Sequence, residues 1–490
     1  MPPVTDTSLP SPAAPVHRNM ILAIACLGQF MVVLDVAIVN VALPAMRQEL
    51  EFSATGLQWV VNAYTLAFAG LLLLGGRTAD LFGRRRMFLV GLGVFTAASL
   101  VCGLALNPGA LVAARAAQGL GAAILAPVTL SIVTTTFVQP HERSRALGLW
   151  SAALASGGAV GVLLGGILTD LLSWRWIFLV NIPVGIAGII IGRMVVPEGR
   201  AEKRLSLDIA GALAITAALS SLVFGIVETT NHGWVSPITL GPIVAAVVLG
   251  VVFVVIETRM ASAPIAPLGI LRSRALTGAN ISLACVGGSM FAMWYFMSLY
   301  LQEVLGLTPL QAGLGFIPAS LGVIVGSQFA GRLVPRTGPR PVLVVAGLVI
   351  SGSLFWMSRM SADGSYFGDV FGPITVVSLG LGASFPPGVF AAMSSVRPAE
   401  SGLASGLVNS SRQIGGAIGL AALATIAAHR TGALGAGETA AEALTDGYAR
   451  AIAIGSIVAL GTAITAFIIP GGRPRFTPTT PAPAEESGGA

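Results

Sequence analysis

The chain has 490 residues, 54% of them hydrophobic and only 10% charged, and its mean hydropathy is +0.85. Because charged residues make up roughly 25% of soluble domains, this composition excludes an ordinary soluble domain and predicts a polytopic membrane protein. The net charge of +6 does not predict binding to nucleic acid, because the arginines fall in short loops between apolar runs and form no basic domain.

The two ends of the chain differ from the rest. Residues 1–19 and 471–490 are Pro-rich and are predicted to be disordered cytoplasmic tails. The first apolar run begins near Met20, is too long for a signal peptide and lacks a small-residue cleavage site, so we expect it to remain as the first transmembrane helix. The three cysteines lie singly within apolar runs, which argues against a disulfide framework and against a zinc site.

A helix that crosses a bilayer needs about 20 mostly apolar residues. Fourteen runs meet this requirement, with approximate bounds of 20–43, 57–76, 86–106, 109–136, 145–170, 175–196, 207–227, 237–257, 276–301, 309–333, 341–360, 368–392, 403–428 and 449–470. The connection "ETTNHGWVSP" within 207–257 is polar and rich in turn formers, which predicts a hairpin of two helices there.

Positive residues predict the orientation of these helices, because loops rich in Arg and Lys are retained on the cytoplasmic side. With the amino end inside, the outer segments contain only Arg47, Arg175, Arg359, Arg430 and Arg450. All other Arg and Lys residues fall on the cytoplasmic side, apart from two arginines deep within helices. The sequence therefore predicts a multi-pass protein of the cytoplasmic membrane with both termini in the cytoplasm.

One carboxylate interrupts the first apolar run, "QFMVVLDVAIVNVALP" at 29–44. Asp35 lies about 15 residues into that helix, roughly 22 Å along it, and Arg115 lies at a comparable depth in the fourth helix. A lone charge at this depth costs at least ~2.5 kcal/mol, so the two opposite charges are expected to pair. Burial disfavours the charged carboxylate and a nearby Arg favours it, so a rearrangement could make Asp35 take up or release a proton. A purely structural ion pair is the alternative.

The sequence contains an internal repeat. The loop "GRTADLFGRRR" after the second helix matches "GRLVPRTGPRP" after the tenth, and "ERSRALGLWSAALASGGAVG" at the fifth matches "ESGLASGLVNSSRQIGGAIG" at the thirteenth. Both matches recur at nearly the same offset and in the same membrane orientation. They predict two parallel six-helix halves, 20–196 and 276–470, separated by an inserted hairpin at 207–257. Parallel halves of this kind enclose a midplane cavity in rocking transporters.

Several segments resemble a known family. The loop "GGRTADLFGRRRMFLVG" at 75–91 resembles the signature between helices two and three of the major facilitator superfamily. The segments "LDVAIVNVALP", "RAAQGLGAAILAP", "GGAVGVLLGGILTD" and "SWRWIFLVNIPVG" together resemble the fourteen-helix drug:proton antiporter family of that superfamily. The resemblance implies an all-α major facilitator fold of two six-helix halves plus a two-helix hairpin. It also implies that Asp35 takes part in proton coupling and that Arg115 belongs to the same polar cluster.

The loop after the second helix is interpreted as a cytoplasmic gate. Its residues are Gly76, Asp80, Gly83, Arg84 and Arg85. The glycines permit a tight turn and close helix approach, while the Asp can lie at a helix end or pair with the arginines. The family resemblance gives Asp80 the gating role, and the alternative is that the arginines only set the topology. The second copy has Pro335 at the Asp position, so the gate is predicted to be asymmetric.

The fifth helix carries a face of small residues, Gly157, Gly158, Gly161, Gly165 and Gly166. Such a face lets another helix backbone approach closely. In the family this is the antiporter signature and lies between the halves, whereas the motif without the family is a packing motif. Val162 stands where the family usually has Pro, so the resemblance does not extend to a Pro-dependent bend.

Polar and aromatic residues on candidate interior helices are predicted to line a substrate cavity. They are Asn40, Asn62, Tyr64, Gln118, Trp294, Tyr295, Gln328, Phe385, Asn409 and Arg412. Arg412 either binds an anionic or polar substrate group or only extends its side chain toward the interface. Because no acid other than Asp35 is clearly buried in a helix, dicationic substrates are disfavoured relative to monocationic, zwitterionic or neutral lipophilic ones.

These features predict a proton-coupled exporter of lipophilic or amphipathic compounds, such as drugs and antibiotics, that works by alternating access as a monomer. Its partners would be the small molecule, protons and membrane lipid. The alternatives are an exporter of one endogenous metabolite or self-made antibiotic, an importer, and a non-transporting sensor or scaffold. An ATP-driven pump is disfavoured because no Gly-x-x-x-x-Gly-Lys-[Ser/Thr] loop occurs. A membrane-embedded enzyme is disfavoured because the helices contain no His and no clustered acids, and no cofactor or metal is predicted.

Overall fold

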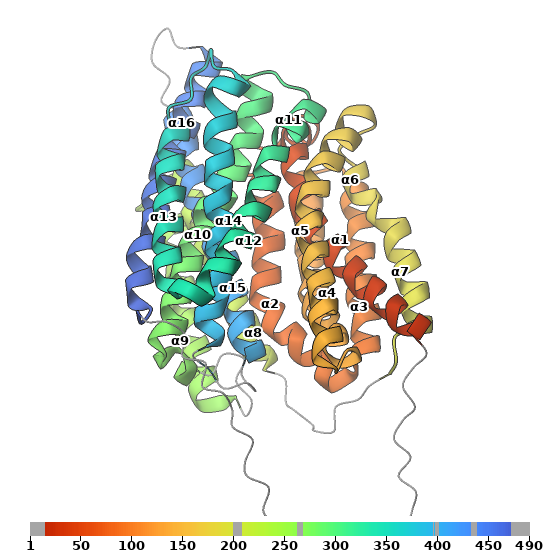
Figure 1. Ribbon diagram of the computed structural model, residues 1–490. Coiled ribbons are helices and arrows are strands. Elements are labelled where there is room, and N and C mark those ends of the chain that lie inside the picture. The colour runs from red at the N-terminus through yellow and green to blue at the C-terminus, as the bar shows by residue number, and fades with distance from the viewer. Residues whose placement is uncertain are drawn as a thin grey trace, which may run out of the picture.

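The computed structural model describes residues 15–198, 208–261, 268–394, 396, 401–432 and 439–471. Within these ranges every regular element is a helix (Figure 1). Fourteen segments are long and apolar enough to cross a membrane. The predicted all-α fold and the predicted fourteen spans are therefore confirmed for the described part of the chain.

The first part of the chain forms six of these spans. The helices are α1 Pro15–Glu49, α2 Trp59–Phe82, α3 Arg84–Gly103, α4 Pro108–Thr136, α5 Pro140–Leu171, α6 Trp176–Leu179 and α7 Asn181–Val195. The sixth span is interrupted at Val180, between α6 and α7. Asn107 caps α4 by accepting a hydrogen bond from the Ala110 amide, which supplies a partner for one of the free amides at the helix start.

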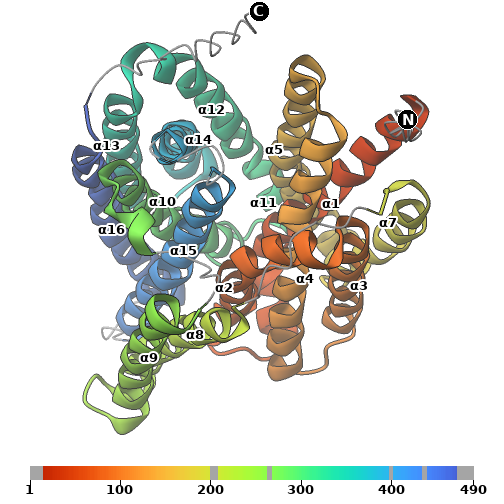
Figure 2. The same ribbon diagram turned by 90° about the horizontal axis from the view of Figure 1, so that it is seen from below.

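A hairpin of two helices follows, α8 Ile209–His232 and α9 Pro237–Val255. Its start is fixed by Asp208, which accepts a hydrogen bond from the Gly211 amide at 2.8 Å. Helix α9 buries only Thr239 and Ala246, and it stands at the edge of the molecule (Figure 2). Because α9 is apolar all round, its exposed faces suit contact with lipid.

The last part of the chain forms the other six spans, several of them built from two segments. The helices are α10 Arg274–Leu299, α11 Pro309–Gly315, α12 Ile317–Thr337, α13 Pro339–Met357, α14 Phe371–Met393, α15 Ser401–Gly432 and α16 Ala440–Thr465, joined by the short η2 Leu268–Arg272, η3 Tyr300–Val304, η4 Tyr366–Val370 and η6 Ala466–Ile468. The π-helical η1 Ile256–Met260 ends the hairpin.

Seen from below, the helices form two groups. Helices α1 to α7 lie together on one side and α10 and α12 to α16 on the other, with α11 between them beside α5 (Figure 2). Helix α1 begins and α16 ends toward the lower end in Figure 1, which we call the terminal side; the opposite end is the far side. The largest apolar core joins the two groups through residues such as Leu43 of α1 and Met297 of α10.

The predicted repeat has a counterpart in backbone conformation. Gly83 separates α2 from α3 with φ +91°, and Gly338 separates α12 from α13 with φ +87°. These are residues that the two matching loops align. A positive φ of this size disfavours residues with a Cβ, so both loops need glycine for the same sharp reversal.

Glycines also bring equivalent helix pairs together in the two groups. A Cβ added to Gly161 of α5 would lie 2.8 Å from the Leu34 carbonyl of α1. In the second group, a Cβ added to Gly415 of α15 would lie 2.1 Å from the Ala284 carbonyl of α10. Close backbone approach through small residues is a common way to pack membrane helices without a hydrophobic driving force.

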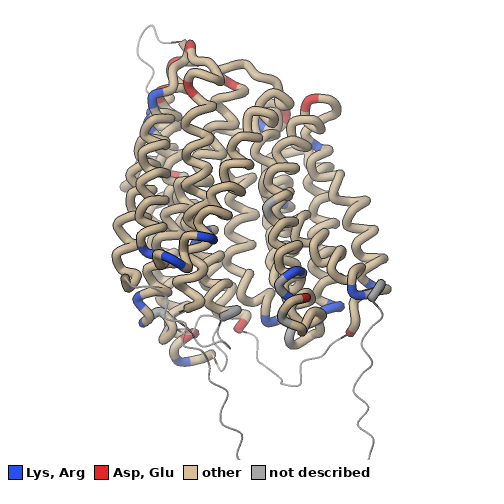
Figure 3. Tube along the Cα trace, viewed as in Figure 1, with Lys and Arg blue, Asp and Glu red and all other residues tan. Residues whose placement is uncertain are grey.

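Charged residues lie mainly toward the two ends of the bundle, and the middle is largely free of them (Figure 3). This distribution matches the cost of holding a charge in a bilayer. Within the described residues, the exceptions deep in the spans are Asp35 and Arg115, in the first group of helices, and Arg412 in the second.

Candidate functional site

Asp35 and Arg115 form an ion pair in the interior of the first group of helices. Asp35 lies near the middle of the span in α1, and its relative exposure is 0%; that of Arg115, on α4, is 2%. Arg115 Nη1 donates to Asp35 Oδ2 at 2.6 Å. The pairing predicted from their depths is therefore present in the structure.

Gln118 extends the pair into a network that we call the Asp35 cluster: Asp35, Arg115, Gln118 and Ser99. Gln118 Nε2 donates to Asp35 Oδ1 at 2.6 Å and to Ser99 Oγ at 2.8 Å, while its Oε1 accepts from Arg115 Nη1 at 2.6 Å. Ser99 in turn donates to the Phe95 carbonyl. Both carboxylate oxygens thus have donors, which offsets part of the cost of burying the charge.

Neighbouring groups enclose the guanidinium of Arg115. Its Nε donates to the Val60 carbonyl at 2.9 Å, and its Cζ lies 4.4 Å from the ring centroid of Tyr64 and 5.7 Å from that of Phe178. Contacts of a cation with aromatic faces strengthen when water is excluded. Asn181 also lies close to the carboxylate.

The Asp35 cluster connects three helices through one titratable group. Asp35 comes from α1, Arg115 and Gln118 from α4, and Ser99 from α3. Protonation of the carboxylate would remove its charge and weaken the bonds that it accepts. Arg115 would then be a buried cation without its counter-ion, which is costly, so the cluster couples proton binding to the packing of α1 on α4.

Several predicted cavity residues have other contacts. Gln118 belongs to the Asp35 cluster, Tyr64 packs on Arg115, and the Asn40 side chain donates to the Val36 carbonyl one turn earlier in α1. Asn62 is buried, and neither its amide nitrogen nor its amide oxygen has a hydrogen-bond partner.

The remaining predicted cavity residues lie in the second group of helices. Trp294 stacks on Phe316 at 4.8 Å between ring centroids, Tyr295 is buried and Gln328 is exposed. Arg412, Asn409 and Phe385 lie together: Arg412 Nη2 donates to Asn409 Oδ1 at 3.1 Å, and its Cζ is 5.8 Å from the Phe385 ring centroid. Among the predicted second-group residues, Arg412 and Asn409 form a polar pair beside the Phe385 ring.

The predicted gate is only partly described. Gly76 lies near the end of α2, and Gly83 makes the turn into α3. Arg84 Nε donates to Ser131 Oγ of α4 at 2.9 Å, within its own group of helices, and the Arg85 side chain is half-buried. The side chain of Asp80 lies outside the described residues, so its gating role stays a prediction.

The small-residue face of α5 packs mainly inside one group. A Cβ at Gly157, Gly161 or Gly165 would meet α1, whereas a Cβ at Gly158 would meet nothing within 4 Å. Gly166 alone of these glycines faces the other group, where its Cβ would lie 2.7 Å from the Pro309 carbonyl. Helix α5 runs unbroken through Val162.

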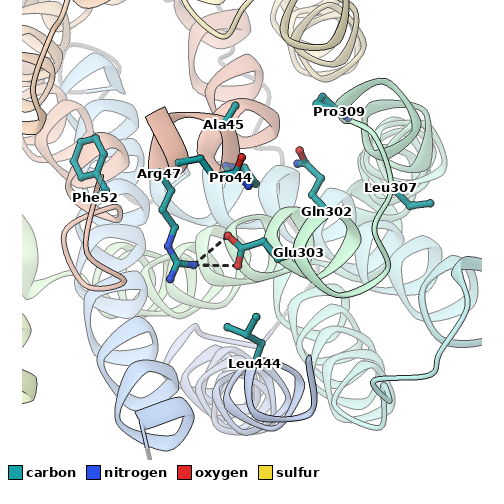
Figure 4. Close-up of a pocket in the computed structure, with 10 residues that line it drawn as sticks. Pro44, Ala45, Arg47, Phe52, Gln302, Glu303, Leu307, Pro309 and Leu444 are labelled. Carbon is teal, nitrogen blue, oxygen red and sulfur yellow. Dashed lines mark hydrogen bonds and ion pairs between the residues drawn. The ribbon is translucent and has the colours of Figure 1, made fainter. Parts of the chain in front are cut away.

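A contact between the two groups at the far side was not predicted. Arg47 Nη1 donates to both carboxylate oxygens of Glu303 at 3.1 Å, and Tyr448 Oη donates to the same carboxylate at 2.9 Å. This ion pair borders a pocket of about 610 Å³ (Figure 4). Arg47 and Glu303 are 256 positions apart, and no local pattern in the sequence links them.

Three further hydrogen bonds join the groups near the same end. Ser298 Oγ donates to the Asn40 carbonyl at 2.6 Å, and Gln302 Nε2 donates to the Val41 carbonyl at 2.9 Å. Thr308 donates to Asp170 at 3.2 Å. The conformation described therefore has its two groups of helices tied together at the far side.

The fold and the Asp35 cluster define a class: a polytopic membrane protein of two repeated helical groups with a titratable pair buried in the first. The chain belongs to the Major Facilitator Superfamily, whose family model matches residues 25–420. The resemblance identified from the sequence motifs is thereby confirmed. Within the described residues, no group of three or more His, Cys, Asp or Glu residues is positioned to hold a metal ion.

Curated relatives cover most of the chain. It is 42% identical to the cephamycin export protein CmcT of Amycolatopsis lactamdurans, over 83% of this chain and 84% of that protein. It is 38% identical to the puromycin resistance protein pur8 of Streptomyces alboniger, over 91% and 90% respectively. It is 35% identical to the tetracenomycin C resistance and export protein of Streptomyces glaucescens, over 84% and 76%.

Solved structures share the fold at low sequence identity. An inward-facing bacterial homolog of the human lysosomal transporter Spinster has a TM-score of 0.65 at 15% identity, over 93% of this chain and 98% of that chain. The POT family transporter PepTSo has a TM-score of 0.66 at 15% identity, over 93% and 99%. This likeness concerns the fold alone.

Proposed function

We propose that the protein exports lipophilic or amphipathic compounds, antibiotics among them, across the cytoplasmic membrane in exchange for protons. The observation that carries the proposal is the buried pair of Asp35 and Arg115. It lies in a chain of the Major Facilitator Superfamily whose relatives are export and resistance proteins. An intramembrane ionisable group is a functional-site hypothesis by default, because holding it there has a cost.

Asp35 is the proposed proton carrier. In its ionised form the carboxylate holds Arg115 and Gln118 and so ties α1 to α4. When it is protonated this tie weakens, and α1 becomes free to shift. Because α1 also carries the far-side contacts at Asn40 and Arg47, a shift of this helix reaches the junction of the two groups.

We propose that alternating access uses one closure at each end of the molecule. We propose that the terminal side faces the cytoplasm, since most Arg and Lys residues fall there in the predicted topology. In the conformation described the far side is tied, so the compound would enter from the cytoplasm and leave after the Arg47–Glu303 contact breaks. The loop with Asp80 is the proposed gate on the cytoplasmic side, and the protein would act as a monomer.

The test is uptake of ethidium into inverted vesicles driven by an imposed pH gradient. Wild-type vesicles should accumulate ethidium, and Asp35→Asn vesicles with matched protein content should not exceed vesicles without the protein. The amide keeps the size of the side chain and removes its proton-binding charge. Full uptake by the mutant would remove Asp35 from the coupling mechanism, and no uptake by wild type would count against a multidrug exporter.

A second candidate is an exporter of one metabolite or self-made antibiotic. The names of the cephamycin and tetracenomycin C export proteins favour it. Competition separates the two candidates: a multidrug exporter should show inhibition of ethidium uptake by several unrelated amphipathic compounds. A single-metabolite exporter should transport none of these compounds. It should transport only molecules that share the chemical scaffold of its own metabolite.

A further inference from the structure

Arg412 is a deep cation of a different kind from Arg115. It lies 11 residues after the start of α15 at Ser401, about 16 Å along the helix at 1.5 Å per residue. In the described part of the chain it forms no ion pair, and its one hydrogen bond is to Asn409 Oδ1. Its Nε is buried and has no hydrogen-bond partner.

The backbone of Arg412 packs on α10, where a Cβ added to Gly287 would lie 1.9 Å from the Arg412 carbonyl oxygen, while its side chain lies near Phe385 of α14. Ser410 donates to the Ala69 carbonyl of α2 at 3.2 Å, and Ser411 donates to Asn280 Oδ1 of α10 at 2.8 Å. Arg412 and Asn409 lie on the remaining face, toward α14, where Phe385 lies 5.8 Å from the guanidinium. Phe385 is 40% exposed, so packing does not cover it completely.

A cation held deep in a membrane protein without an acid is costly. Arg412 therefore needs an acceptor that a bound ligand could supply. Its Nε is buried, so solvent does not supply the missing acceptor to that atom. A guanidinium presents several N–H donors in one plane and matches a carboxylate in two parallel hydrogen bonds. An unpartnered Nε–H next to an exposed aromatic ring therefore suits a ligand with a carboxylate beside an apolar body.

We propose that Arg412 binds the carboxylate of a transported amphipathic compound, with Phe385 contacting the apolar part. The inference rests on the proposed function and adds to its substrates a class of anionic and zwitterionic compounds that bind through Arg412, whereas a cation such as ethidium would bind without using it. Asn409 orients the guanidinium through its hydrogen bond. Together with the intact ion pair of Asp35, this arrangement separates the proton site in the first group of helices from an anion site in the second.

The test compares an acid with its ester. The probes are N-dansyl-phenylalanine, a fluorescent apolar carboxylate, and its methyl ester, which has the same body without the charge. Binding to the purified full-length protein is measured by equilibrium dialysis, with protein-free micelles as the blank. Wild type should bind the acid at least about tenfold more tightly than the ester, the order expected for charge-assisted hydrogen bonds to a buried cation.

Three variants locate the effect. Arg412→Gln should lose the preference for the acid, and Arg412→Lys should keep part of it. Arg359→Gln is the matched control, because Arg359 lies 5.0 Å from the Phe355 ring but is exposed outside the spans, and it should keep the full preference. The comparison of acid with ester in wild type needs no variant, so it still tests the anion site if a mutant folds poorly.

Equal affinity for acid and ester in wild type, binding of neither, or an unchanged preference in Arg412→Gln would overturn the anion site. The outcome is independent of the proposed transport. Ethidium uptake with no acid preference would overturn the anion site alone. Acid-selective binding without any proton-driven uptake would overturn the export proposal and leave the anion site in place.

Discussion

Arg115 and Arg412 are both deep in the membrane-spanning region, and their surroundings are opposite. Arg115 has a carboxylate, an amide and a backbone carbonyl as acceptors and two aromatic rings as neighbours. Arg412 has one amide acceptor, and its Nε lacks a partner. The difference teaches that equal depth does not mean equal role: the first arginine is part of a closed network, whereas the second has unused donors.

The largest effect should come from breaking the closed network. Arg115→Gln leaves Asp35 buried without its counter-ion, so the free energy of unfolding should fall by about 3–5 kcal/mol, the range for removing one partner of a buried pair. Arg412→Gln removes a cation that has no acid partner, so stability should be unchanged or higher. Unfolding by titration with SDS in mixed micelles measures both.

The double variant Asp35→Asn/Arg115→Gln provides the control for that comparison. It removes both charges, so it should be more stable than Arg115→Gln alone, which shows that the uncompensated carboxylate causes the loss. A loss in Arg412→Gln as large as that in Arg115→Gln would contradict the assigned difference between the two arginines.

A smaller effect should follow from the amides that contact the two guanidiniums. Gln118→Leu removes a donor to Asp35 and an acceptor from Arg115, and the unsatisfied groups should lower stability by about 1–3 kcal/mol. Asn409→Leu removes one acceptor from a side chain that is already partly unsatisfied, so it should cost less. The same SDS titration measures both variants. Equal losses of stability in Gln118→Leu and Asn409→Leu would contradict the assigned difference between the two arginines.

Most of the fold could be predicted from the sequence, because apolar runs of membrane-spanning length leave few alternatives. The fourteen spans and the matching turns at Gly83 and Gly338 both follow from local pattern. The breaks within spans were not predicted, although the break at Val180 has a local cause: Pro183, in the first turn of α7, has no amide hydrogen to donate to the Leu179 carbonyl.

The site was predicted in part. Depth along a helix predicted the pair of Asp35 and Arg115, since a charge in a bilayer requires a partner. Depth alone could not distinguish Gln118 as a member of that network from Gln118 as a cavity residue. The Arg47–Glu303 contact was missed because both residues lie near span ends, where solvation is the ordinary expectation and the partner is distant in sequence.

The central claim is that Asp35 couples transport to protons without being needed to bind or move the compound. Proteoliposomes test it directly by comparing two modes of the same Asp35→Asn protein: uptake of ethidium driven by a pH gradient, and exchange of labelled for unlabelled ethidium at equal pH on both sides. The account predicts that the mutant loses the first and retains the second, while wild type shows both. Retained pH-driven uptake in the mutant, or loss of both modes in a mutant that is folded, would contradict it.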